Sequence, residues 1–359
     1  MIQTDRLLQL VLDLIRIDSP SGQEDRTATR VMSELAALGL RPERDAAGNV
    51  IASVPGVGEP ILLNAHLDSV NPCSGIRPVV RDGVIFSDGT TVLAADDKAG
   101  IAVILEVLRA LGPEEQARPA LEVVFTVQEE LGLVGAKALD LSKLVAKRGL
   151  VLDGGGSAGV FWVSAPGQDN ISVTIKGRAA HAGVCPEEGI SAIVAASRAI
   201  ATMKLGRIDS ETTANVGTIA GGTARNVVPE EARVVAEARS RDMSKLETQT
   251  RHMVTAFEQA AADIGAHADV VVTRSYDAFR IREDSPFLQR LMATARSIGL
   301  EPTLKDGGGG SDANVFNRHG IEAVVLGLGI ESPHTTSERL VIEDMQKTAS
   351  LVLAFLTSR

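Results

Sequence analysis

The sequence predicts an α/β protein with a mostly parallel sheet that has helices on both faces, interrupted by an inserted ferredoxin-like α+β domain. Three observations predict it. Helix-spaced and short apolar segments alternate from residue 1 to 168, a different order of elements fills 169 to 282, and the first pattern resumes from 283 to 359. With 359 residues, 44% of them hydrophobic, the chain has enough apolar side chains for two cores.

The first part of the chain has the pattern of a parallel sheet that is covered on both faces. Short, bounded apolar runs predict central strands at 61–65, 121–127 and 149–152. Apolar residues at helical spacing predict helices at 4–16, 24–38 and 98–111. After residue 283 we expect helices at 285–299 and 342–357 and a further buried strand at 322–327.

The middle of the chain follows another order: strand, helix, strand, strand, helix, strand, which is the ferredoxin-like arrangement. The strands are predicted in NISVTIKG, ANVGTIAGG, EARVVAEARS and DVVVTRSYDAF, and the helices at 189–204 and 244–264. We therefore expect one domain formed by 1–168 and 283–359, and an inserted domain formed by 169–282.

Composition and charge exclude two classes of partner. The net charge of -10 argues against nucleic acid, because phosphate binding needs a basic face. No stretch reaches the roughly 20 apolar residues of a membrane span. Charged residues interrupt the apolar positions of the first 18 residues, which favours an amphipathic helix over a signal peptide and predicts a cytoplasmic protein.

Acidic and imidazole side chains follow the predicted central strands. His66 and Asp68 end the first, Glu129 and Glu130 the second and Asp153 the third, and a loop after the last strand leads to His334. Each alone is ordinary loop composition. Because ligands of open α/β sheets bind at the carboxyl ends of strands, their joint occurrence predicts one site at this edge.

The candidate ligands point to metal ions. Oxygen and imidazole donors without thiolates suit zinc, manganese or cobalt. The candidates number five and exceed the needs of a single catalytic zinc, whereas two ions that share a bridging carboxylate would use all of them. Four of them, His66, Glu130, Asp153 and His334, follow predicted strands, and the fifth, Asp96, is implied by a family resemblance.

Two neighbouring pairs suggest supporting roles. His66 and Asp68 lie two apart on a strand, so Asp68 can accept a hydrogen bond from the imidazole and fix its tautomer; the alternative is an aspartate that only starts a turn. Glu129 and Glu130 repel each other unless one binds a metal and the other acts as general base on the attacking water. The alternative is two solvated glutamates.

Eight strings, in this order, resemble the M20 metallopeptidase family, which includes peptidase T, glutamate carboxypeptidases and aminoacylases. The ADDKAG and GGSDAN strings look closest to its peptidase T-like branch. The resemblance implies a zinc-exopeptidase-like fold and a homodimer through an inserted lid domain. The strings are NAHLDSV, AADDKAG, QEELGLVGA, VLDGG, GRAAHAGVCPEEG, GGTARNVVPEE, GGGSDANVF and SPHTTSERL.

The resemblance also implies roles for single residues. Asp96 resembles the bridging carboxylate, whose following peptide bond is usually cis in the family, and Glu129 resembles the general base. Asp68 resembles the residue that orients the imidazole of His66. The remaining ligands implied are Glu130, Asp153 and His334.

In the inserted segment, His181 resembles the histidine that reaches the partner subunit's site and stabilises the charge on the carbonyl oxygen. Arg225 and Asn226 resemble substrate contacts, although a turn before a proline accepts such residues for structural reasons. Gly309 and Gly310 belong to a glycine run that lets the backbone approach the substrate closely.

Together these features predict a two-metal exopeptidase, with zinc as the first choice and manganese or cobalt as alternatives. It would hydrolyse short peptides as an aminopeptidase or tripeptidase, with Glu129 activating the water that bridges the metals. A carboxypeptidase or an N-acyl-amino-acid deacylase is the alternative within the same chemistry. A non-catalytic binding protein on the same fold is the alternative from another class.

Overall fold

The computed structural model describes residues 1–112 and 119–358, which divide into two compact units. The first comprises Met1–Ser164, Arg280–Gly307 and Ser311–Arg359, and the second comprises Ala165–Phe279 and Gly308–Gly310. Among the described residues, no helix combines the length and the apolar character needed to cross a bilayer.

A 12-stranded sheet forms the centre of the first unit. Its four central strands run parallel in the order β6 (Leu121–Thr126), β3 (Ile61–His66), β7 (Arg148–Gly155) and β16 (Glu322–Glu331). The side chains of β3 and β6 are buried throughout, which accounts for their uninterrupted apolar sequences. The carboxyl ends of these strands therefore meet at one edge.

The outer strands of this sheet make it mixed, because most of them pair antiparallel to their neighbours. Only the central strands were predicted. The remaining strands are β1 (Glu43–Arg44), β2 (Val50–Val54), β4 (Val79–Arg81), β5 (Val84–Phe86), β8 (Val160–Ala165), β14 (Phe279–Arg280), β15 (Thr303–Asp306) and β17 (Arg339–Val341).

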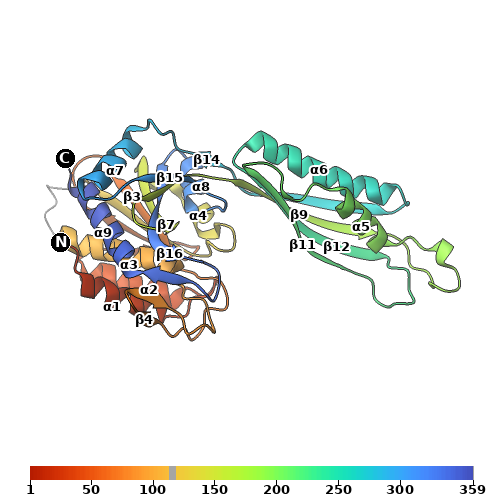
Figure 1. Ribbon diagram of the computed structural model, residues 1–359, viewed down its shortest axis with the longest axis horizontal. Coiled ribbons are helices and arrows are strands. Elements are labelled where there is room, and N and C mark those ends of the chain that lie inside the picture. Colours follow the sequence, from red (N-terminus) through yellow and green to blue (C-terminus); the bar gives the residue numbers. More distant parts are fainter. Residues whose placement is uncertain (113–118, 359) are drawn as a thin grey trace. The chain divides into compact units, whose positions relative to one another are not determined.

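Helices lie on both faces of the sheet (Figure 1). On one face, α3 (Ala95–Leu111) packs against β3 and β7, and α9 (Ile342–Thr357) packs against β16. The helix α8 (Asp312–Arg318) packs against both β16 and α4 (Val134–Ala138). The other helices of this unit are α1 (Thr4–Ile15), α2 (Asp25–Ala37) and α7 (Pro286–Ser297).

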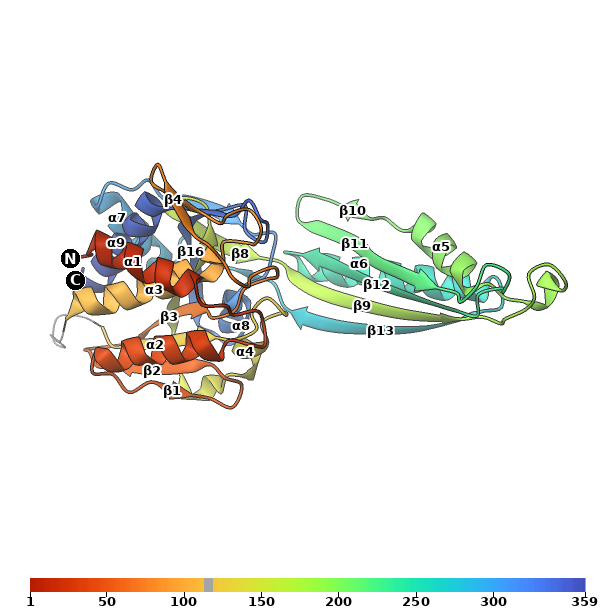
Figure 2. The same ribbon diagram turned by 90° about the horizontal axis from the view of Figure 1, so that it is seen from below.

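The second unit has a five-stranded antiparallel sheet with the order β10-β11-β12-β9-β13. Its two helices, α5 and α6, pack against each other and against the sheet (Figure 2). Apart from the short β10, the elements follow the predicted order. They are β9 (Gly167–Lys176), α5 (Ala192–Thr202), β10 (Gly206–Arg207), β11 (Thr212–Gly221), β12 (Glu231–Ser240), α6 (Met243–Ala262) and β13 (His267–Tyr276).

Close approach of α3 to β7 depends on Gly100, since a β-carbon there would overlap the carbonyl oxygen of Leu152 and the carboxylate of Asp97. We expect Gly100→Ala to lower the free energy of unfolding by roughly 1–3 kcal/mol, because the helix must shift away from the strand. Gly308→Ala is the matched control, since a β-carbon at Gly308 meets no atom within 4 Å. Chemical denaturation followed by circular dichroism measures both, and equal stabilities would contradict the packing argument.

Candidate active site

The carboxyl edge of the parallel strands collects the candidate metal ligands of the first unit. His66 is the last residue of β3 and Asp153 lies near the end of β7. Glu130 follows β6 and His334 follows β16, each in the loop beyond its strand. Asp96 comes from the start of α3, where its backbone departs from helical geometry. The fold therefore brings together five residues that are far apart in sequence.

One group of donors forms around His66, whose side chain is 2% exposed. Its Nε2 atom lies 3.1 Å from Oδ1 of Asp96 and 3.6 Å from Oδ1 of Asp153. A second group forms around His334, whose Nε2 atom lies 3.2 Å from Oδ2 of Asp96 and 3.0 Å from Oε1 of Glu130. Asp96 thus presents one carboxylate oxygen to each group.

These distances fit the ligand shells of small divalent cations. Tetrahedral zinc with bonds of about 2.0–2.1 Å spaces its ligand atoms about 3.3–3.4 Å apart. Oε1 of Glu130 is buried and has no hydrogen-bond partner among the described residues, although Nε2 of His334 is only 3.0 Å away. The two atoms are close but not aligned as donor and acceptor, as expected of two ligands aimed at a common ion.

A further combination of donors includes Glu129. His66, Glu129 and Glu130 also offer atoms within 4.8 Å of one another. Two of the three groups contain Asp96, which presents Oδ1 to one and Oδ2 to the other, and two of them contain Glu130. The two groups that share Asp96 include His66, Asp153, Glu130 and His334 but not Glu129.

The electrostatics of the cluster favour cations. Burial raises the pKa of Asp153 to about 7 and raises that of Glu129 well above its ordinary value. The carboxylates of Asp96 and Glu130 beside its imidazole raise the pKa of His334 to about 10. Burial lowers the pKa of His66, but hydrogen bonds with carboxylates outweigh it and hold that pKa well above the usual value. These shifts share one cause, a concentration of buried carboxylates that favours added positive charge.

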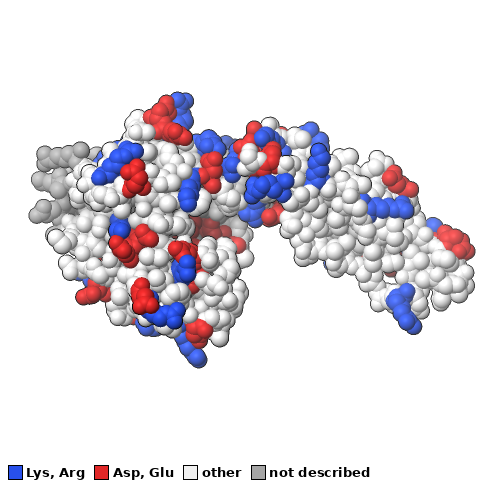
Figure 3. Space-filling model, viewed as in Figure 1, with Lys and Arg blue, Asp and Glu red and all other residues white. Residues whose placement is uncertain are grey.

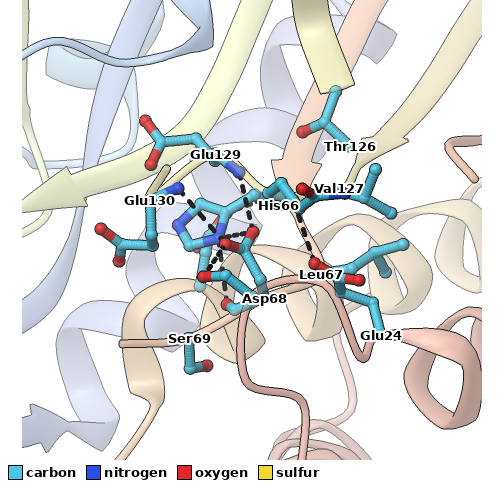
Figure 4. Close-up of polar contacts among 12 residues, drawn as sticks. Glu24, His66, Leu67, Asp68, Ser69, Thr126, Val127, Glu129 and Glu130 are labelled. Atoms are coloured by element: carbon cyan, nitrogen blue, oxygen red, sulfur yellow. Dashed lines mark hydrogen bonds and ion pairs between the residues drawn. The ribbon is translucent and has the colours of Figure 1, made fainter. Parts of the chain in front are cut away.

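Asp68 contacts both His66 and the segment that carries the two glutamates, and its side chain is fully buried. Nδ1 of His66 lies 3.1 Å from the carbonyl oxygen and 3.3 Å from Oδ1 of Asp68. The backbone N–H groups of Glu129 and Glu130 donate to Oδ1 and Oδ2 of Asp68, at 3.0 and 3.3 Å (Figure 4). Sequence reasoning anticipated the contact with the imidazole but not those with the glutamate backbones.

Glu129 is 8% exposed, and its side chain extends away from Asp68 (Figure 4). Its backbone is fixed by the N–H bond to Asp68, while its carboxylate lies beside the cluster, where it can reach His66 and Glu130. A buried carboxylate on an anchored backbone beside candidate cation sites is well placed to exchange a proton with a water molecule.

Several buried polar residues around the site were not assigned a role from the sequence, although they lie in the strings quoted above. Nζ of Lys98 donates to the carbonyl oxygen of Leu67 at 2.7 Å, and burial lowers the pKa of this lysine to about 8. Asp97 accepts from the backbone N–H of His66 at 3.1 Å. The only sequence signal for such residues is a charge inside an otherwise apolar segment.

In the second unit, the structure brings together three predicted residues. His181 is exposed and forms an isolated β-bridge with Val227. The N–H of Ala182 donates to the carbonyl oxygen of Asn226 at 3.0 Å, so the loops that carry His181 and the exposed Arg225 lie side by side.

Packing within the second unit explains Gly310 but not Gly309. A β-carbon at Gly310 would overlap the ring of Tyr276, whose hydroxyl donates to Oε1 of Gln168 at 2.6 Å. A β-carbon at Gly309 would meet only Arg239, at 4.0 Å. The substrate contact expected of Gly309 and Gly310 stays a prediction.

Acidic and basic side chains are interspersed on the face seen in Figure 3. Such a distribution is typical of an ordinary solvated surface and differs from the basic stripe that follows a nucleic-acid backbone.

Comparisons with known proteins identify the family of this chain. Residues 62–358 match the sequence model of "Peptidase family M20/M25/M40". The protein YqjE of Bacillus subtilis (strain 168) is 42% identical over 99% of both chains. The crystal structure of aminopeptidase PepT from Bacillus cereus is 42% identical, with a TM-score of 0.90 over 99% of this chain and 98% of that one. A tripeptidase structure from Staphylococcus aureus is 40% identical, with a TM-score of 0.94 over the same shares.

The match therefore extends over nearly the whole chain and includes the strand ends that carry the cluster. The chain belongs to the peptidase family M20/M25/M40 and is a peptide-hydrolysing enzyme.

Proposed function

We propose that this enzyme is a two-metal aminopeptidase that acts on short peptides, with tripeptides as the first class to test. The observation that carries the proposal is the position of Asp96, whose two oxygens face two separate groups of donors. The substrate classes in the names of the two solved relatives, an aminopeptidase and a tripeptidase, support the choice of the amino end.

In this proposal His66 and Asp153 would hold one ion, His334 and Glu130 the other, and Asp96 would bridge them. Carboxylate and imidazole donors suit zinc, with manganese and cobalt as alternatives. When bound, the two ions would polarise the scissile carbonyl and lower the pKa of the attacking water.

Glu129 would act as the general base. Its carboxylate would take a proton from the water as that water attacks, and would then deliver the proton to the nitrogen of the leaving amine. Burial, which raises the pKa of Glu129, makes its carboxylate a stronger base than an exposed glutamate. Asp68 would keep this base in place through the backbone N–H bond at 3.0 Å.

His181 would act from a second subunit. We propose a homodimer formed through the second unit, in which His181 donates a hydrogen bond to the carbonyl oxygen of a substrate bound by the partner. The exposed position of His181 suits a residue that acts outside its own unit. Arg225 and Asn226, on the adjoining loop, would contact the substrate.

A panel of tripeptides and dipeptides with free, N-blocked or C-blocked ends tests the substrate class. With the zinc-loaded enzyme we expect cleavage only where the amine is free, measured by mass spectrometry of the products. Glu129→Gln is the matched control: it should retain about two zinc ions per chain and lose at least about a hundredfold in kcat. Cleavage of N-blocked peptides that requires a free carboxylate would identify a carboxypeptidase or deacylase instead.

Hybrid dimers test the role of His181. Co-expression of Glu129→Gln and His181→Ala chains should restore about a quarter of wild-type activity, because half of the dimers are hybrids and each hybrid has one intact site. The control replaces the first partner by a chain with both substitutions, which leaves no intact site in any dimer. If the co-expressed single variants are no more active than this control, His181 does not act across the dimer.

A further inference from the structure

A buried glutamate that the proposed mechanism does not use connects two parts of the metal cluster. Glu338 is 2% exposed and follows His334 in the loop beyond β16. Its Oε2 atom accepts hydrogen bonds from the backbone N–H groups of Leu93 and Ala94, both at 2.9 Å. Its Oε1 atom accepts from the backbone N–H of Asp96 at 3.0 Å. Three donors from one short segment thus converge on a single carboxylate.

That segment is the start of α3, which lacks a cap of its own. Ala94 has no side-chain oxygen to accept from the first N–H groups of the helix, and its backbone is left-handed, with φ of 58°. Unpaired N–H groups and the positive end of the helix dipole both favour a negative charge at this position. Glu338 supplies this charge from a position more than 240 residues further along the chain.

The loop that carries Glu338 is itself tightly bonded. The N–H of Glu338 donates to the carbonyl oxygen of Thr335 at 3.1 Å, and Oγ1 of Thr335 donates to the carbonyl oxygen of Ser332 at 2.8 Å. His334 lies within this turn, with a left-handed backbone at φ of 63°. Glu338 and His334 are therefore parts of one hydrogen-bonded turn.

We propose that Glu338 is a positioning residue that fixes His334 and Asp96 relative to each other and so builds the second cation site. This inference rests on the proposed pair of metal ions. Both His334 and Asp96 belong to the donor group that also contains Glu130. In the group around His66, by contrast, only Asp96 depends on Glu338. Loss of this carboxylate therefore weakens the site at His334 more than the site at His66.

Glu338→Gln separates this role from simple packing. Glutamine has nearly the same size, but it offers one acceptor oxygen and an amide NH₂ group. Where the carboxylate received three N–H donors, the amide NH₂ would face an N–H group. Glu331→Gln is the matched control, because Glu331 ends β16 only a few residues before the same turn and pairs with Arg339 on the surface.

The test is a Co²⁺ titration of the metal-stripped full-length protein, followed by visible absorption and by metal content after dialysis. The wild type and Glu331→Gln should take up two ions. Glu338→Gln should bind the first with affinity within about threefold of wild type and the second at least tenfold more weakly. If Glu338→Gln does not fold, Glu338→Asp takes its place, since its shorter stem withdraws the carboxylate from the three donors.

The outcomes distinguish a failure of the positioning role of Glu338 from a failure of the two-metal function. If the wild type binds two ions and the variant at position 338 binds both with wild-type affinity, the positioning role of Glu338 is wrong while the proposed function stands. Equal weakening in Glu331→Gln would also overturn this role. If the wild type itself binds fewer than two ions, the two-metal function fails and the inference falls with it.

Discussion

The carboxylate of Asp96 is the constraint on which the site depends. Its two oxygens face the imidazoles of His66 and His334, at 3.1 and 3.2 Å. The site therefore forms only if the segments that carry these two histidines, which are far apart in sequence, both reach Asp96. Parallel strands bring His66 and Asp153 to one edge of the sheet, and the kinked start of α3 brings Asp96 to the same edge. The sheet and its central helix therefore serve as the frame for a single shared carboxylate.

Around Asp96, buried carboxylates hold backbone N–H groups instead of packing against apolar side chains. Asp68 holds Glu129 and Glu130, Asp97 holds His66, and Glu338 holds the start of α3. Buried charges of one sign are costly unless hydrogen bonds or cations compensate them. Backbone N–H donors compensate these three buried carboxylates. The carboxylates among the candidate metal ligands need either protons or metal ions instead.

Much of this could be predicted from the sequence, for physical reasons that differ between elements. Fully buried strands such as β3 and β6 stand out as apolar runs. The prediction that His66 and Asp68 share one strand was wrong, because β3 ends at His66, although the two residues do lie in contact. Short outer strands such as β1 and β17 could not be predicted, because they are only two or three residues long. The role of Glu338 could not be predicted either, because its hydrogen bonds to the start of α3 join residues more than 240 positions apart. Local patterns do not contain such contacts.

The central claim is that Asp96 bridges two metal ions, and anomalous X-ray diffraction at the zinc edge from crystals of the zinc-loaded enzyme tests it most directly. We expect two anomalous peaks about 3.5–4 Å apart, with one oxygen of Asp96 in contact with each ion. His66 and Asp153 should complete one site, and His334 and Glu130 the other. A single peak at full zinc loading, or two peaks of which only one touches Asp96, would contradict the account.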